Sequence, residues 1–164
     1  MNIGEIGIEA ARAKIGPIAD NAQFGREVTY LTRHGKHIAA VVPLNVLTHL
    51  TRLRATEHLI SRGIPVNFQH DPTRTFPEPV IRIYVKGETL SWGDAGRVVM
   101  EAALPTNSTP SDIQAAQDLL GRAVEVLTEG GFELVEDHRT SDKLSGLTYD
   151  NIRYRLTPLG FVHL

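Results

Sequence analysis

The chain has 164 residues, which is enough for one ordinary domain or two small ones. A hydrophobic fraction of 41% beside 22% charged residues predicts a folded chain, and the lack of cysteine excludes disulfides, thiolate catalysis and cysteine-ligated metals. No apolar run in the sequence approaches the roughly 20 residues that cross a bilayer, and the start lacks the pattern of a secretory signal, so we expect a cytoplasmic protein without a membrane partner.

The net charge of −2 is divided unevenly along the sequence. Residues 1–62 hold 8 Lys+Arg and 5 Asp+Glu, whereas residues 63–164 hold the remaining 9 and 14. This asymmetry favours a front part that meets an anionic partner and a back part that does not. An imbalance of this size also arises by chance.

The front of the chain is predicted to follow the order β-α-α-β-β-α. A short strand at residues 2–6 precedes a helix-forming run at residues 9–14. Gly16 and Pro17 interrupt this run, and proline suits the first turn of a new helix, where its missing N–H is not needed. The second helix should end at Gly25.

Residues 27–43 carry the clearest local signal, that of a β-hairpin. Two runs rich in β-branched and aromatic residues flank a basic turn centred on His34-Gly35, where positive φ is needed; glycine adopts it freely and histidine more readily than most residues. An isolated hairpin is marginal in water, so this one should pack against helices or another chain. Alternation gives each strand a shared face, made of Val28, Tyr30 and Thr32 on one strand and Ile38, Ala40 and Val42 on the other.

A helix is predicted at residues 44–61, and Gly63 and Pro65 end it. Its leucines recur at helical spacing and predict one apolar side, made of Leu44, Leu47, Leu50 and Leu53. Residues 64–79 then hold four prolines without a periodic pattern, which is typical of a semi-rigid linker.

The second half begins with a predicted strand at residues 80–85. A helix should follow from Ser91 to Leu104, because Ser91 and Asp94 form a capping pattern and apolar residues recur at helical spacing. The longest helix should start at residues 108–111 and end at Gly130-Gly131. Its apolar stripe is Ile113, Ala116, Leu120, Ala123, Val124 and Leu127.

Two alternating strands, at residues 132–135 and 152–156, complete the second half, joined by a polar stretch at residues 137–148 that should be a mobile loop. Residues 154–160 also resemble the segment that closes the wing of winged-helix regulators. A winged-helix-like fold therefore stays open beside a small α+β module for protein contact or dimerisation.

The fold class predicted for the whole chain is α+β. Its expected divisions are a front domain at residues 1–63, a linker at residues 64–79 and a second domain at residues 80–164.

Residues 8–43 carry a recurring order of elements: Glu9-Ala-Ala-Arg12 opens a short helix, a second short helix follows, and a glycine precedes a hydrophobic strand. That strand leads into Thr32-Arg33-His34-Gly35-Lys36, a second strand, Pro43 and an amphipathic helix. In this order and spacing, the residues from Ile8 to Pro43 resemble the Phd/YefM family of antitoxins from bacterial type II toxin–antitoxin modules. The resemblance covers the front of the chain and nothing after the linker.

The resemblance implies a homodimer that binds operator DNA, represses its own operon and neutralises a cognate toxin. In that family an arginine of the first helix and the basic hairpin turn lie against DNA. The matching positions are Arg12 and Arg33, with Lys14, His34 and Lys36 beside them. Basic side chains release counterions from phosphates, and arginine also binds guanine in a bidentate way, so Arg12 or Arg33 should read bases and Lys36 should contact phosphate.

Other interpretations stay open. Basic residues often decorate an exposed hairpin for solubility alone. The chain could instead be a protein–protein adaptor that kept the fold and lost DNA binding, or a regulator without a toxin. Residues 64–164 replace the family's short toxin-binding tail, which leaves toxin neutralisation less supported than DNA binding.

The sequence contains no catalytic constellation. His34 and His37 flank the hairpin turn without an acidic residue near them in the sequence, which favours a solvated hairpin over a metal site. Glu133, Glu136 and Asp137 fit a solvated strand end. We therefore expect no enzyme activity, no cofactor and no metal.

Overall fold

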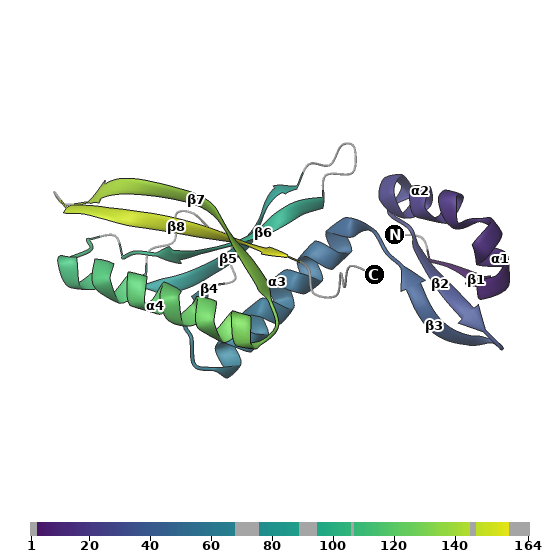
Figure 1. Cartoon of the computed structure of the whole chain (residues 1–164), viewed down its shortest axis with the longest axis horizontal. Coiled ribbons are helices and arrows are strands. Elements are labelled where there is room, and N and C mark those ends of the chain that lie inside the picture. Colours follow the sequence, from purple (N-terminus) through teal and green to yellow (C-terminus); the bar gives the residue numbers. More distant parts are fainter. Residues whose placement is uncertain (1–2, 68–75, 89–94, 106, 145–146, 158–164) are drawn as a thin grey trace. The chain divides into compact units, whose positions relative to one another are not determined.

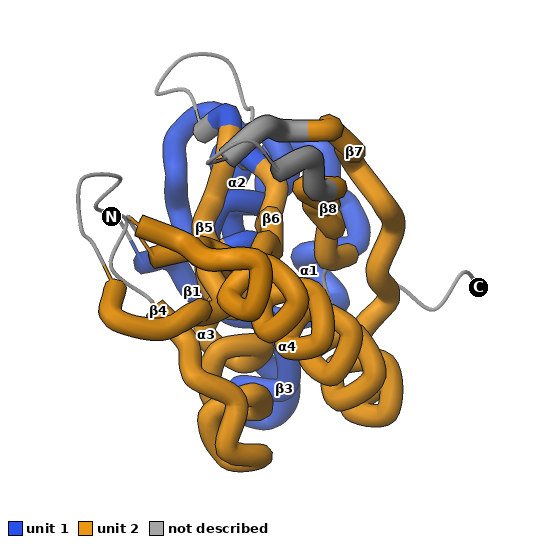
Figure 2. Tube along the Cα trace, turned by 90° about the vertical axis from the view of Figure 1, so that its left-hand side faces the viewer, with its two compact units in different colours: residues 1–48, 87–96 blue, residues 49–86, 97–164 orange. Residues whose placement is uncertain are grey.

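The computed structural model describes residues 3–67, 76–88, 95–105, 107–144 and 147–157. These residues form four helices and two β-sheets, so the predicted α+β class is confirmed (Figure 1). The chain divides into two compact units, unit 1 with residues 1–48 and 87–96, and unit 2 with residues 49–86 and 97–164 (Figure 2). The linker at residues 64–79 stays a prediction, since residues 68–75 lie outside the described residues.

Unit 1 contains a three-stranded sheet with the order β1-β2-β3. β1 and β2 are parallel and are joined by two short helices, and β3 pairs antiparallel with β2. The predicted order of elements is confirmed, with bounds β1 Ile3–Gly7, α1 Ile8–Ala13, α2 Ile15–Gly25, β2 Val28–Arg33, β3 Lys36–Val41 and the start of α3 Leu44–Ser61.

Local sequence explains the ends of α2. Pro17 lies in its first turn, where a missing N–H costs nothing, as predicted. After Gly25 the chain turns at Arg26, which adopts the left-handed conformation with φ of 53° and donates its N–H to the Asn21 carbonyl. The helix therefore ends where the glycine predicted it.

The register of the β2–β3 hairpin corrects one expectation from alternation. Tyr30 pairs with Ala40, but Thr32 pairs with His37, so Ile38 is the extra residue of a β-bulge. The predicted shared face of Ile38, Ala40 and Val42 is therefore broken at Ile38. The bulge places His37 on the side of Tyr30.

Unit 2 contains a five-stranded sheet with the order β4-β5-β6-β8-β7. α4 is the predicted longest helix, and Thr109 caps it in a capping box with Asp112. The bounds are β4 Val66–Asn67, β5 Val80–Glu88, β6 Ala95–Ala103, α4 Pro110–Glu129, β7 Glu133–Leu144 and β8 Leu147–Thr157.

The core of unit 2 lies between its sheet and the helices α3 and α4. Both helices contribute to one cluster with alternate residues of β5 and β6, so they cover the same face of the sheet. Its members include Ala55 and Leu59 of α3, Ile81 and Ile83 of β5, Val98 and Met100 of β6, Leu120, Ala123 and Leu127 of α4, and Leu156 of β8. Most of the stripe predicted for α4 is therefore buried as expected.

The predicted helix from Ser91 to Leu104 is wrong. Residues 95–103 form strand β6, which pairs with β8 from Val98 to Glu101, while residues 91–94 lie outside the described residues. A winged-helix fold would need a helix directly before α4 to form its helix-turn-helix. Residues 95–103 form a strand at that place, which counts against the winged-helix alternative.

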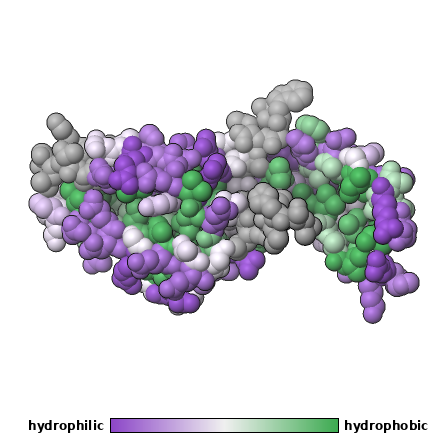
Figure 3. Space-filling model, in the orientation of Figure 1, coloured by the Kyte–Doolittle hydropathy of each residue, from purple (hydrophilic) through white to green (hydrophobic). Residues whose placement is uncertain are grey.

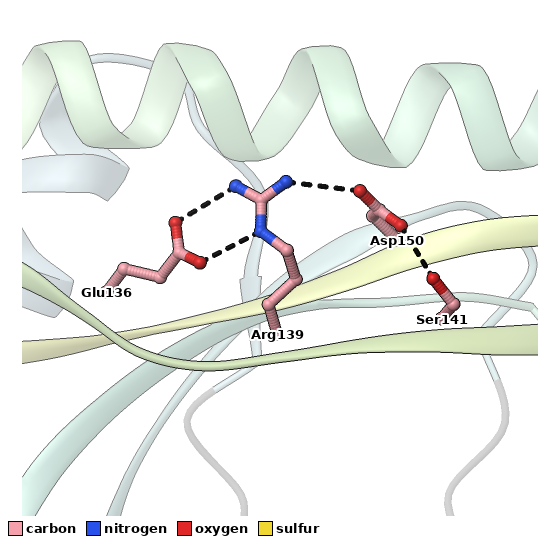
Figure 4. Close-up of polar contacts among 4 residues, drawn as sticks. All are labelled: Glu136, Arg139, Ser141 and Asp150. Carbon is pink, nitrogen blue, oxygen red and sulfur yellow. Dashed lines mark hydrogen bonds and ion pairs between the residues drawn. The ribbon is translucent and has the colours of Figure 1, made fainter.

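The polar stretch at residues 137–148 is also different from the prediction. It continues β7 and β8 as a long hairpin, paired from Glu133–Thr157 to Leu144–Leu147, with a bulge after Glu136. Arg139 and Ser141 of β7 both donate to Asp150 of β8, and Arg139 also donates to Glu136 on its own strand (Figure 4). The two bonds to Asp150 cross between the strands and help a polar sequence to hold an extended pair.

The buried side of α3 is not the leucine side that the sequence predicted. Leu44, Leu50 and Leu53 are each about half exposed, whereas Thr48, Thr51 and Thr56 are buried. Ala55 and Leu59 are the apolar side chains that α3 contributes to the core. The exposed leucines of α3 therefore form an outer apolar surface that takes no part in the core of unit 2.

Candidate nucleic-acid interface

The β2–β3 hairpin ends in a tight two-residue turn. Arg33 pairs with Lys36, and between them His34 and Gly35 both have positive φ, of 50° and 71°. Positive φ at both central positions is the pattern of a type I′ turn, whose twist matches that of the flanking strands. The turn predicted from the sequence is confirmed, and it presents three exposed basic side chains, those of Arg33, His34 and Lys36.

The first helix begins at the same end of the unit 1 sheet as this turn. β1 runs parallel to β2, and its last residue, Gly7, pairs with Thr32, the residue before Arg33. α1 starts at the next residue, Ile8. The fold therefore brings α1 and the hairpin turn together from separate parts of the sequence (Figure 1).

Arg12 and Lys14 lie on the exposed side of this helical corner. Arg12 donates to Glu9 one turn earlier, at 3.1 Å, and both side chains are more than 70% exposed. Lys14 is exposed at the junction where α1 ends and α2 begins. A surface pair of this kind adds at most about 1 kcal/mol, so Arg12 can exchange Glu9 for a phosphate at small cost.

Next to the turn, three side chains form a cluster on one face of the unit 1 sheet, which we call the outer face: Glu5, Tyr30 and His37. The His37 ring stacks on Tyr30, with centroids 4.5 Å apart and planes 16° apart, and His37 Nε2 lies 3.3 Å from Glu5. The sequence showed no acidic residue near His37, but parallel pairing of β1 with β2 supplies one. Sequence patterns miss this cluster because its members come from three strands.

The same outer face carries apolar side chains that unit 1 leaves uncovered. Ile3 is 70% exposed, and pairing places it beside Val28, on the side of Tyr30 and Ala40. Hydrophobic residues gather over the strands of unit 1 on the side seen in Figure 3. Because exposed apolar side chains that lie together commonly mark an interaction site, this face is suited to contact with another chain.

Other kinds of site have less support in the described part of the chain. Across residues 3–67, 76–88, 95–105, 107–144 and 147–157 no three His, Asp or Glu side chains converge to hold a metal. A pocket between α4, β6 and β8, lined by Ile113, Leu120 and Asp150 among others, has a volume of about 20 Å³, room for about one water molecule. No helix among the described residues is long and apolar enough to span a membrane.

The structure brings all five predicted residues, Arg12, Lys14, Arg33, His34 and Lys36, to unit 1, and three of them to one turn. Arg12 lies on α1, which begins at the turn end of the sheet, and Lys14 is the residue directly after α1. Whether these side chains meet DNA stays a prediction.

Comparisons with known proteins add no relative. No protein-family model matches the chain, and neither a curated protein nor a solved structure matches it.

Proposed function

We propose that this protein is a dimeric DNA-binding repressor of the Phd/YefM antitoxin kind, with unit 1 as its DNA-binding part. The observation that carries the proposal is the type I′ turn at His34-Gly35, which projects Arg33 and Lys36 from the end of the sheet where α1 begins. Exposed guanidinium and ammonium groups on a rigid turn can neutralise phosphates without reorganisation.

Dimerisation follows from the uncovered face of the unit 1 sheet. A two-fold dimer through Ile3, Val28 and Tyr30 would bury this face and present two basic turns. Two copies of one turn, related by two-fold symmetry, fit a pseudo-palindromic operator. The homodimer is therefore part of the proposal, and autoregulation of the operon is its expected consequence.

Binding of a cognate toxin is the remaining part of the proposal. The half-exposed residues Leu50, Leu53 and Ile60 of α3 offer an apolar strip for such a partner. Toxin binding and operator binding would then be coupled reciprocally. The alternative of an adaptor without DNA binding uses the same strip and predicts that the basic turn is dispensable.

The test is binding of the full chain to the DNA upstream of its own gene, measured by anisotropy at salt from about 50 to 200 mM. We expect Arg33→Ala to weaken binding by roughly tenfold or more and to lower the salt slope by about 0.9 for each phosphate that the variant no longer neutralises. Arg12→Ala should act in the same direction.

Arg122→Ala is the matched control, because it removes the same charge from an exposed position of α4 in unit 2. Its affinity for the operator should equal that of the unmodified protein. Equal affinity of Arg33→Ala and Arg122→Ala, or no preference for the upstream DNA over random DNA, would favour the adaptor.

A further inference from the structure

One face of the unit 2 sheet carries neither α3 nor α4, and it is rich in arginine. In β5 and β6, the residues that alternate with core residues point away from the helices. Pairing of β8 with β6 and β7 adds further side chains to this face. Val99 on this side is fully buried, and the members that are exposed or half-buried are Arg82, Tyr84, Arg97, Glu101, Val135, Arg153 and Arg155. We call this set the open sheet face.

Two arginines of the open sheet face are fixed by carboxylates beneath them. Arg153 Nε donates to Glu101 at 2.6 Å, and Arg97 donates to Asp137 at 3.0 Å. The carboxylate side chains are only 12% and 14% exposed, whereas the arginine side chains are 31% and 51% exposed. The acids are therefore covered and the guanidinium groups face outward.

Two further arginines have no acidic partner among the described residues. Arg155 is exposed and lies across from Val99 on one side and Val135 on the other. Arg82 lies over the Phe76 ring, with its guanidinium carbon 5.6 Å from the ring centre. Lys86 and Glu133, at the ends of their strands, add one charge of each sign to this face.

On the opposite side of the sheet, α4 is acidic, whereas α3 carries the exposed Arg54 and Glu57. α4 exposes or half-exposes Asp112, Asp118, Glu125 and Glu129, with Arg122 as its one basic residue. The excess of acid found in the back half of the sequence is thus gathered partly on α4, and basic residues are gathered on the open sheet face.

Aromatic side chains accompany the arginines. Tyr84 is half-buried, and its hydroxyl donates to Glu101 at 3.4 Å, the same carboxylate that holds Arg153. Burial, and then the charge of Glu101, raise the pKa of Tyr84, which keeps the hydroxyl protonated as a donor. The Tyr84 ring and the Arg82–Phe76 pair therefore lie in fixed positions beside the guanidinium groups.

We infer that the open sheet face binds single-stranded nucleic acid, separately from the duplex contact proposed for unit 1. Single strands are held by basic side chains that follow the phosphates and by aromatic or guanidinium planes that stack on bases. The open sheet face offers both. An acidic protein segment would use the arginines but has no need of the rings, so the nucleic acid fits more of this face.

The experiment measures binding of the full chain to a fluorescent oligothymidine of about 20 nucleotides, longer than the roughly 4–16 nucleotides that one site covers. Arg82→Ala and Arg155→Ala are the test variants, because neither leaves a buried carboxylate without its partner. Each should weaken binding about tenfold and lower the salt slope by about 0.7. Tyr84→Leu should weaken it, while Tyr84→Phe, which keeps the ring, should not.

Two controls separate this inference from the proposed repressor function. Arg122→Ala should bind oligothymidine like the unmodified protein, and Arg33→Ala should keep oligothymidine binding while its affinity for the operator duplex falls. Thermal unfolding of each variant verifies that it is folded.

Absence of oligothymidine binding would overturn the inference. Binding that Arg33→Ala abolishes and Arg155→Ala leaves intact would also overturn it, because the strand would then lie on unit 1. Equal affinity for polyglutamate, with Tyr84→Leu unchanged, would assign the face to an acidic protein partner instead.

Discussion

The two units of this protein differ in how completely they bury their own apolar residues. Unit 2 has a continuous core in which Leu59, Ile81, Met100 and Leu127 have no exposed side-chain surface. Unit 1 buries mainly small residues of its helices and leaves Ile3, Ile15 and Phe24 more than half exposed. Unit 2 thus covers its own apolar residues, whereas the uncovered sheet face of unit 1 is the basis of the dimer that we propose.

The largest effect should come from the core of unit 2. Leu59→Ala creates a cavity in a fully buried site and should lower the free energy of unfolding by about 2–5 kcal/mol. Leu53→Ala, on the same helix but 50% exposed, is the matched control and should cost much less. Urea unfolding of both variants measures the difference, and equal destabilisation would contradict the division of α3 into an inner and an outer side.

Two glycines near α4 give a second matched pair. A Cβ at Gly130 would lie 2.5 Å from His58 Nε2, which contacts the Val126 carbonyl at 3.2 Å, so Gly130→Ala should displace His58 and cost about 1–3 kcal/mol. Gly121 has nothing within 4 Å of its added Cβ, and Gly121→Ala should stabilise the helix by up to about 1 kcal/mol. Opposite signs in urea unfolding are the expected result; a stabilising Gly130→Ala would contradict the α3–α4 contact.

The cap of α4 should have a smaller effect that depends on pH. Thr109 donates from its backbone N–H and its hydroxyl to Asp112, and these bonds hold the pKa of Asp112 below its ordinary value of 3.8. Because the folded pKa is lowered, this stabilisation is present above that value and is lost as the pH falls through the folded pKa. Thr109→Ala should cost about 1 kcal/mol at neutral pH and reduce the loss of stability in acid.

The ion pairs of the β7–β8 hairpin should give the smallest effect. Hydrogen bonds from Arg139 lower the pKa of Glu136, so this contribution is present above the ordinary value of 4.5 and declines in more acidic solution. Arg139→Met should cause a small decrease in thermal stability at neutral pH that disappears at low pH. Added salt should reduce the decrease as well, and a decrease that ignores both pH and salt would contradict an electrostatic origin.

Local signals predicted some elements well. The hairpin turn follows from the need for positive φ, and α4 follows from its cap, its apolar stripe and its closing glycines. The bounds of α3 follow from Pro43, Gly63 and Pro65, which limit the helix at both ends.

The segments that the sequence predicted wrongly form strands because they pair with strands far away in the sequence or across a long hairpin. Residues 95–103 contain alanine, methionine and glutamate, which favour a helix, but pairing with β8 makes them a strand. The open sheet face has a visible signal, the alternation of arginine with apolar residues at 81–84 and 152–155. That alternation predicts strands, but only the topology shows that both segments present arginine on one face.

The most direct test of the central claim, that a second copy completes unit 1, is the molar mass of the full chain in solution. We predict the mass of two chains, and the mass of one chain for Ile3→Asp, which places a carboxylate on the uncovered sheet face. Ile15→Asp is the control, because Ile15 is 56% exposed on α2, outside the sheet, and should leave the dimer intact. A single-chain mass for the unmodified protein, or a dimer in both variants, would contradict the claim.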